Sequence, residues 1–270
     1  GRGEDEETGG TKRGESVFLP DHHLNDLDVI LVSMHPVCEY LISLTYAAQK
    51  SEEWLALRGN MLTASDAATA IGENHYQTPH DLLLKKCGLG EKFTGNDATR
   101  WGEKYEDVAR ELYEERYGEK VHEIGLVPHP EHRWLGGSPD GVSESGKLIE
   151  IKCPMMRKII PGEVPAHYVP QIQLCMEILN LESCDFIQYA PIELTWPEPE
   201  VLDVTHVKRD REWFAKYLPV MDAFWKKVLY HREHGGLEAP PPKKTRPRKP
   251  KPPKECEIVD VPDDDEYFSD

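Results

Sequence analysis

The 270-residue sequence lacks the features that mark several common classes of protein. No stretch approaches the roughly 18 uncharged apolar residues that a membrane-spanning helix needs. The first residues, GRGEDEETGG, are too polar and too charged for a signal peptide. The six cysteines include no C-x-x-C pair, so neither a zinc site nor a disulfide framework is indicated. We therefore expect an intracellular protein of the nucleus or cytoplasm, neither secreted nor embedded in a membrane.

Positive charge is scarce, since 32 Lys and Arg stand against 49 Asp and Glu and the net charge is −17. Proteins bind nucleic-acid phosphates largely through Lys and Arg, so this balance argues at first against a nucleic-acid partner. Much of the negative charge, however, lies at the two ends of the chain, at residues 4–7 and 255–270. Carboxylates that bind metal ions also add negative charge, so the total does not exclude such a partner.

Composition divides the chain into three parts. Residues 1–23 are polar and glycine-rich, and we expect them to be disordered. Residues 24–236 hold the apolar residues of a single packed domain. Residues 237–270, basic and proline-rich at first and acidic at the end, are also expected to be disordered.

Two interpretations stay open for each half of that last segment. The basic stretch EAPPPKKTRPRKPKPPKE is a solvated extended tail or, less simply, a nuclear-localisation or DNA-tethering signal. The acidic stretch ECEIVDVPDDDEYFSD is a partner-binding peptide or a solubilising tail.

Helical and strand patterns alternate between the ends and predict an α/β (α+β) fold. Ser51 is placed to cap one helix, Thr63 begins the next, and Gly118 ends a long one. Apolar spacing predicts further helices near 25–50, 78–87, 167–179 and 210–232, and the aromatic residues of the last are expected in the core. Strands are expected up to 127, at 134–135, at 147–153 and at 184–191, the first three as a β-meander between helices.

The chemical signal is concentrated in the segment LIEIK. The period of two in a strand places Glu150 and Lys152 on one face, and Ile149 and Ile151 on the other. Asp140 precedes them in the turn GSPDG, and a hairpin-like return can bring its carboxylate beside Glu150. Two oxygen ligands would then converge next to an ammonium group.

This pair of carboxylates suits Mg²⁺, which one or two carboxylates usually hold together with water and substrate phosphate. Mn²⁺ is an alternative ion. The predicted ligands are Asp140, Glu150 and the carbonyl of Ile151. Lys152 would position or deprotonate a water molecule or stabilise charge on a phosphate, and the sequence does not separate these roles. A surface Glu-x-Lys pair alone is common, so this interpretation depends on its context.

The context is a series of motifs: W-x-x-x-R, T-A-S-D, Y-E on a helix, S-P-D-G, E-x-K-C-P and Q-x-Q-x-x-M. Their order resembles the phage lambda exonuclease and YqaJ-type viral recombinase family of the PD-(D/E)-x-K nuclease superfamily, over about half of the chain. The resemblance implies a central mixed β-sheet flanked by helices. It also implies Mg²⁺-dependent hydrolysis of linear duplex DNA from 5′ ends.

The resemblance further implies roles for single residues. Asp140, Glu150 and Lys152 match the catalytic core, joined by Glu106 of the helix and by Gln171. Gln173 is the alternative to Gln171, and Glu131 or His129 stands near an upstream acidic position whose equivalent is uncertain. Three residues match substrate contacts, the first two at a terminal 5′ phosphate: Arg58, Ser65 and Ser138.

Two other functions stay in view. One is a related nuclease of different polarity or structure specificity, since the core motif does not specify which end is attacked. The other is a non-catalytic DNA-binding scaffold with the same fold, against which the intact catalytic set argues. By resemblance, the expected partners are duplex DNA, a single-strand annealing protein and two further copies of the chain in a trimer.

Overall fold

The computed structural model describes residues 33–90 and 95–239. The disorder expected for 1–23 concerns residues outside this part, and so does nearly all of the expectation for 237–270. Residues 25–32 of the first predicted helical stretch also lie outside it; within the described part, that stretch forms α1 (Pro36–Ser43). No helix of the described ranges has the length and apolarity needed to cross a membrane.

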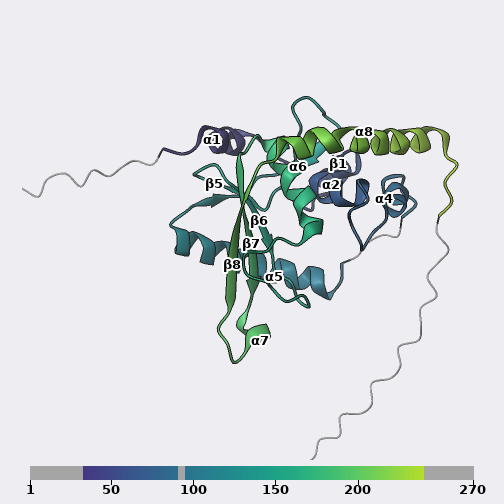
Figure 1. The fold of residues 1–270 in the computed structure, drawn as a ribbon. Helices are drawn as coiled ribbons and strands as arrows, with labels where there is room; N and C mark the ends of the chain where they lie inside the picture. The colour runs from purple at the N-terminus through teal and green to yellow at the C-terminus, as the bar shows by residue number, and fades with distance from the viewer. Residues whose placement is uncertain (1–32, 91–94, 240–270) are drawn as a thin grey trace, which may run out of the picture.

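A five-stranded mixed sheet forms the centre of the molecule (Figure 1). Strands β6 and β7 are parallel, and every other neighbouring pair is antiparallel. The strands follow the order β2 (Val121–His122), β5 (Gly141–Ser143), β6 (Leu148–Lys152), β7 (Ser183–Ala190) and β8 (Val201–Lys208). The α/β expectation is confirmed, and β8 is a strand that the sequence analysis did not anticipate.

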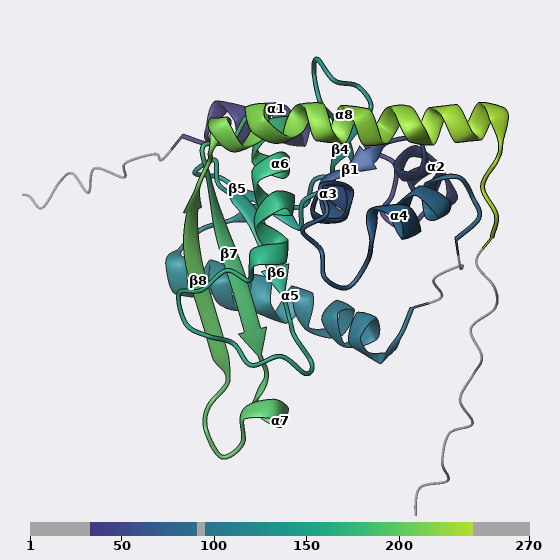
Figure 2. The ribbon, with the colours of Figure 1, turned by 45° about the vertical axis from the view of Figure 1, so that its right-hand side comes forward.

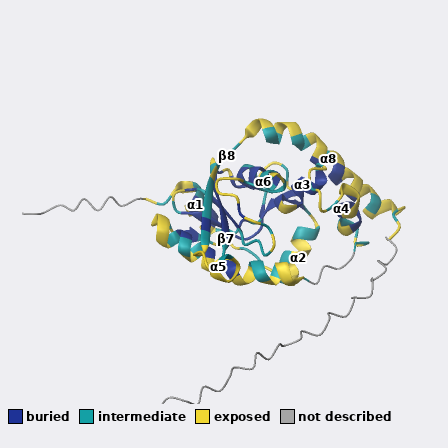
Figure 3. Cartoon of the chain, turned by 60° about the horizontal axis from the view of Figure 1, so that its bottom comes forward, coloured by how far each residue is buried: buried dark blue, intermediate teal, exposed yellow. Residues whose placement is uncertain are grey.

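Helices cover both faces of this sheet. Helix α5 (Asp97–Tyr117) contacts β6, β7 and β8 on one face, while α6 (Val169–Leu179) packs on the other. Leu148 belongs to the apolar cluster on the α6 side, whereas Ile149 belongs to the cluster under α5. The long helix α8 (Arg211–His234) lies over α6, as Figure 2 shows. Both faces of β6 are therefore buried. Figure 3 shows the buried interior in dark blue, with exposed residues on the outer sides of the helices.

The expectation of one β-meander was wrong. Strands β3 (Val127–Pro128) and β4 (Leu135–Gly137) pair with each other in a separate three-stranded sheet, which β1 (Leu62–Thr63) completes by parallel pairing with β4. Strands β2, β5 and β6 belong to the main sheet instead. Because β1 comes from far earlier in the chain, a pattern read along 120–153 could not reveal this division.

The helix ends predicted at Ser51 and Gly118 are confirmed. The Ser51 hydroxyl accepts the Trp54 N–H at 3.1 Å and begins α2 (Glu52–Gly59), and Gly118 ends α5 with φ of 61°. Phe224 and Trp225 of α8 are buried, as expected for core residues. The remaining short elements are η1 (Ala64–Asp66), α3 (Ala67–Ala70), α4 (Pro79–Lys86), η2 (Ala166–Tyr168) and α7 (Ile192–Thr195).

Candidate active site

Strand β6 points two charged residues toward α6. Leu148 packs on that side, so the alternation of the strand turns Glu150 and Lys152 the same way. Glu150 is 1% exposed, and its Oε1 accepts a hydrogen bond from Lys152 Nζ at 2.5 Å. The Gln171 side chain, on α6, donates to the same Oε1. One carboxylate oxygen thus has two donors from different elements.

Asp140 joins this group through the β5–β6 hairpin. The register pairs Gly141 with Ile149, which returns the loop carrying Asp140 to the start of the Glu150–Lys152 segment. Its Oδ2 accepts the Ile151 N–H at 2.7 Å and lies 3.9 Å from Lys152 Nζ. The structure therefore brings Asp140, Glu150, Lys152 and Gln171 together.

The charges of the group perturb one another strongly. Burial, and then the charge of Asp140, raises the pKa of Glu150 to about 7. Glu106 lies at the surface of α5, yet surrounding protein crowds its carboxyl group; this desolvation, and then Asp140, raises its pKa to about 7. Burial acts to lower the pKa of Lys152, but the charges of Glu150 and Asp140 outweigh it and raise that pKa. Glu106 thus belongs to the same electrostatic cluster.

The donor set fits a divalent cation. The Oε2 atom of Glu150 is buried without a hydrogen-bond partner in the structure, a costly arrangement for a carboxylate. Within the described ranges, no three His, Cys, Asp or Glu side chains are grouped so that they could hold a metal alone. Mg²⁺ is usually held by one or two carboxylates, because water and phosphate complete its shell. Asp140 and Glu150 are the candidate ligands, and the Ile151 carbonyl stays a prediction.

The two glutamines of α6 have different surroundings. Gln171 reaches Glu150, whereas the buried Gln173 points to the opposite side. Its Nε2 donates to the carbonyl of Lys208 at 2.9 Å, and its Oε1 accepts the Asp210 N–H at 2.7 Å. Gln173 therefore ties α6 to the connection between β8 and α8, and only Gln171 has access to the cluster.

Arg58 and Ser65 form a second group. Arg58 Nη2 donates to Ser65 Oγ at 2.8 Å and to Thr63 Oγ1 at 3.4 Å, while its guanidinium carbon lies 4.6 Å from the centre of the Trp54 ring. Helix α6, which carries Gln171, packs against η1, which carries Ser65. The two groups thus lie close to one helix. Ser138 is half-buried in the loop that leads to Asp140.

Lys86 holds the second group in place, a role that the sequence analysis missed. Its ammonium forms a buried ion pair with Asp66 at 2.8 Å and donates to the carbonyls of Arg58 and Met61 at 3.0 and 2.7 Å. Asp66 also accepts the Thr63 N–H at 3.1 Å. The only signal in the sequence was a lysine in the last turn of an apolar helix, and such lysines are usually at the surface.

His129 and Glu131, the residues near the upstream acidic position, lie away from the cluster around Glu150. His129 is buried; its Nδ1 accepts the N–H groups of Glu131 and His132, and its ring stacks on Phe214. Glu131 is exposed. His129 therefore shapes a turn beneath α8, and no contact joins either residue to the described cluster.

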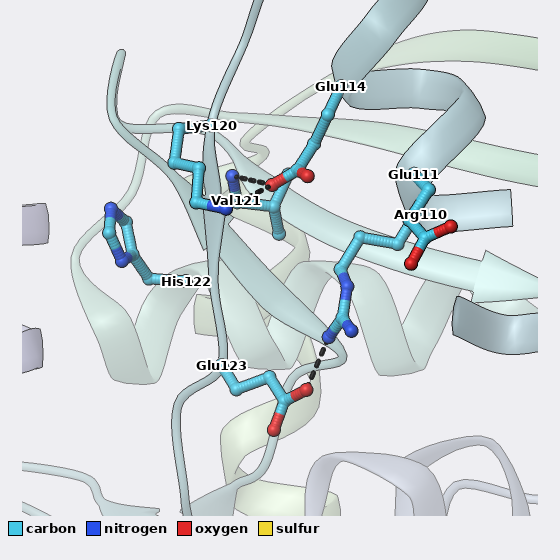
Figure 4. Close-up of a pocket in the computed structure, with 7 residues that line it drawn as sticks. All are labelled: Arg110, Glu111, Glu114, Lys120, Val121, His122 and Glu123. Atoms are coloured by element: carbon cyan, nitrogen blue, oxygen red, sulfur yellow. Dashed lines mark hydrogen bonds and ion pairs between the residues drawn. The ribbon is translucent and has the colours of Figure 1, made fainter. Parts of the chain in front are cut away.

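A surface hollow between α5 and the segment around β2 is a different feature (Figure 4). Four of its charged groups are paired: Arg110 bonds to Glu123, and Glu114 accepts the Val121 N–H at 2.7 Å and lies 3.5 Å from Lys120. Seven residues line it: Arg110, Glu111, Glu114, Lys120, Val121, His122 and Glu123. None of the cluster residues is among them.

Comparison with known proteins places this geometry in context. Residues 53–182 match the family model described as a YqaJ-like viral recombinase domain. An uncharacterized protein of Acanthamoeba polyphaga mimivirus is 34% identical over 157 residues, covering 52% of this chain and 29% of the relative. An African swine fever virus protein is 31% identical, with 46% and 44% covered, and the YqaJ protein of Bacillus subtilis is 28% identical, with 48% and 43% covered. The matched stretch is thus less than half of each of these relatives.

Solved structures extend the likeness. An alkaline exonuclease of Laribacter hongkongensis superposes with a TM-score of 0.55 at 28% identity, covering 68% of this chain and 95% of that one. A phage-related exonuclease of Haemophilus somnus superposes with a TM-score of 0.52 at 16% identity, covering 62% and 93%, and so supports the fold alone. The cluster around Glu150 lies within the matched residues 53–182.

Proposed function

We propose that the chain, whose residues 53–182 match a YqaJ-like viral recombinase domain, is a metal-dependent deoxyribonuclease that degrades linear duplex DNA from 5′ ends. The observation that carries the proposal is the buried Glu150 carboxylate, with one oxygen held by Lys152 and Gln171 and the other without a partner. The likeness to an alkaline exonuclease supports the reaction class.

Each residue of the cluster has a defined task in this proposal. Asp140 and Glu150 would hold Mg²⁺ or Mn²⁺, which when bound neutralises phosphate charge and acidifies a water. Gln171 holds the Glu150 carboxylate in place, and Glu106 adds negative charge beside Asp140. Lys152, held between Glu150 and Asp140, presents an ammonium that orients the attacking water or offsets charge on the phosphate.

Preference for a 5′ end rests on the second group. The Arg58 guanidinium and the Ser65 hydroxyl meet at 2.8 Å, and an arginine fork with a hydroxyl beside it suits a terminal phosphate. The Trp54 ring, on α2, packs against the Arg58 guanidinium, and the Lys86 ammonium, on α4, donates to the Arg58 carbonyl. Ser138 is proposed as a further contact with substrate.

Digestion of linear duplex DNA tests the proposal. The DNA carries either a 5′ phosphate or a 5′ hydroxyl, and Mg²⁺, Mn²⁺ and EDTA are compared. We expect metal-dependent release of nucleotides, a loss of at least about 100-fold in Lys152→Ala, and a loss in Arg58→Ala that is larger on 5′-phosphorylated ends. Lys226→Ala and Arg211→Ala, both at exposed positions of α8, are the matched controls.

The other outcomes have clear meanings. Degradation from 3′ ends, or cutting at internal structures, would replace the 5′ preference with a different nuclease specificity. No hydrolysis with any divalent ion, together with retained DNA binding, would favour a scaffold. The proposed trimer and an annealing partner are tested separately, by light scattering with and without duplex DNA and by co-purification with a single-strand annealing protein.

A further inference from the structure

A chain of aromatic rings leads from the cluster to the surface. The Tyr168 ring centre lies 5.4 Å from Lys152 Nζ and 4.1 Å from the ring of His167. The His167 ring in turn meets His75 at 5.3 Å and Tyr76 at 5.5 Å, both edge-on. Three short contacts therefore connect Lys152 to rings that come from a distant loop.

Hydrogen bonds and ring packing fasten the segments that carry these rings. His75 and Tyr76 belong to the connection between α3 and α4, where the Tyr76 N–H donates to Asn74 at 2.9 Å and Asn74 donates to Thr69 at 2.8 Å. At the other end, Tyr168 packs against the buried ring of Phe186 at 5.6 Å. Helix α3 packs on α6, so this connection stays on the α6 side of the sheet (Figure 2).

Exposure separates these rings from the core. Tyr76 is 74% exposed and His75 is also exposed, whereas a core aromatic would bury its ring. The two rings also contact each other, with 3.8 Å between their centres, and most of the Tyr76 residue stays open to solvent. Such rings offer a free face of the size and chemistry that a nucleobase stacks on.

Positive groups flank the rings. Burial first, and then the nearby His75, Arg157 and Lys152, lowers the pKa of His167 and so favours its neutral imidazole. Arg157 is anchored by a hydrogen bond to Gln188 at 2.8 Å. Aromatic rings interleaved with cations are the combination that binds single-stranded nucleic acid, since bases stack on the rings while phosphates meet the cations.

We propose that Tyr76, His75 and His167 form a stacking platform for an unpaired nucleobase of the strand that enters the Glu150–Lys152 cluster. This inference rests on the proposed function, in which a DNA strand enters the cluster. A base taken out of the stack loses its neighbours, and an aromatic surface replaces them. The Tyr168 ring connects the platform to the Lys152 ammonium, which would face the scissile phosphate.

Fluorescence titration tests the platform without hydrolysis. The probe is a short 5′-phosphorylated oligothymidylate with one 2-aminopurine base, titrated in Ca²⁺, and gel electrophoresis checks that the probe stays intact. We expect quenching on binding to the wild-type chain, a Kd about 5- to 100-fold weaker in Tyr76→Leu with loss of the quench, and near wild-type behaviour in Tyr76→Phe. The matched control is Tyr230→Leu, whose tyrosine is 58% exposed and stacks on His234 at 4.5 Å on α8.

Equal Kd and equal quenching in the wild type and Tyr76→Leu would overturn the platform, and so would a wild-type chain that leaves the fluorescence unchanged. The result is independent of the digestion experiment. A chain that digests no DNA but shows Tyr76-dependent quenching removes the nuclease proposal and keeps the platform. A chain that digests DNA with Tyr76 irrelevant to binding does the reverse.

Discussion

At the scale of single residues, Gln171 and Gln173 show how two identical side chains on one helix differ in role. They are separated by a little over half a helical turn, so they point to different sides of α6. Gln171 is half-buried and bonds to the Glu150 carboxylate, while Gln173 is buried and satisfies two backbone groups near the start of α8.

We expect the two leucine variants to separate activity from stability. Gln171→Leu should lower the rate of DNA hydrolysis at least about tenfold while the free energy of unfolding changes little. Gln173→Leu should lower the free energy of unfolding by about 1–3 kcal/mol, because the hydrogen bonds of the buried Gln173 side chain to the Lys208 carbonyl and the Asp210 N–H are both lost. Urea unfolding and single-turnover cleavage of both variants check this, and the reverse pattern would contradict the assignment.

At the scale of elements, Lys86 links α2, α4 and η1 through one ammonium group. Both partners of its ion pair with Asp66 are buried, at 6% and 9% exposure of their side chains. Removing one partner of such a pair leaves the other charge buried alone.

Lys86→Met should therefore lower the free energy of unfolding by about 3–5 kcal/mol. The double variant Lys86→Met with Asp66→Leu should lose less than the sum of the two single variants, because no unpaired charge is left. Chemical denaturation of the four proteins in the cycle measures this, with Lys226→Met, an exposed lysine, as control. Simple additivity would show that the pair contributes no coupling.

A second network joins α5 to β7, β8 and the turn before β6. The Asp185 carboxylate on β7 accepts hydrogen bonds from Tyr113 of α5 at 2.7 Å and from Lys147 at 3.2 Å, and it contacts His206 of β8 at 2.9 Å. Burial acts to raise the pKa of Asp185, but these hydrogen bonds and the charge of Lys147 outweigh it and hold that pKa below its usual range.

The sign of the pH dependence follows from this shift. Because the pKa of Asp185 is lower in the folded state, its contribution to stability is present above the unfolded pKa of about 3.9. It is lost as the pH falls through the folded pKa. Asp185→Asn should therefore cost about 1–3 kcal/mol at pH 7, a difference that shrinks below about pH 4. Urea unfolding across this pH range checks it, and a cost that does not vary with pH would contradict the network.

At the scale of the whole molecule, metal binding at Asp140 and Glu150 should be linked to global unfolding. An ion that binds only the folded chain stabilises it by about 2.7 kcal/mol when its free concentration is roughly 100 times the Kd. We expect Mn²⁺ to raise the Tm of the wild type by roughly 5–10 °C. Glu150→Gln should abolish the rise, whereas Asp222→Asn, on the exposed side of α8, should keep it. Differential scanning calorimetry measures this without any substrate.

The sequence by itself determined the local features of this protein. Strand alternation put Glu150 and Lys152 on one face, and helix-end signals at Ser51 and Gly118 were confirmed. The ordered motifs predicted the family whose model matches residues 53–182. These features depend on residues close together in the chain, whose spacing alone decides them. The catalytic and substrate-binding roles assigned to individual residues stay predictions.

Only the tertiary structure decided the contacts between distant segments. It divided the expected meander between two sheets, brought Gln171 rather than Gln173 to Glu150, and buried Lys86 against Asp66. It also joined the loop of Tyr76 to His167, about ninety positions later in the chain. Contacts between distant segments depend on how the helices pack on the sheet. The packing energy is spread over many residues, and no local sequence pattern shows it.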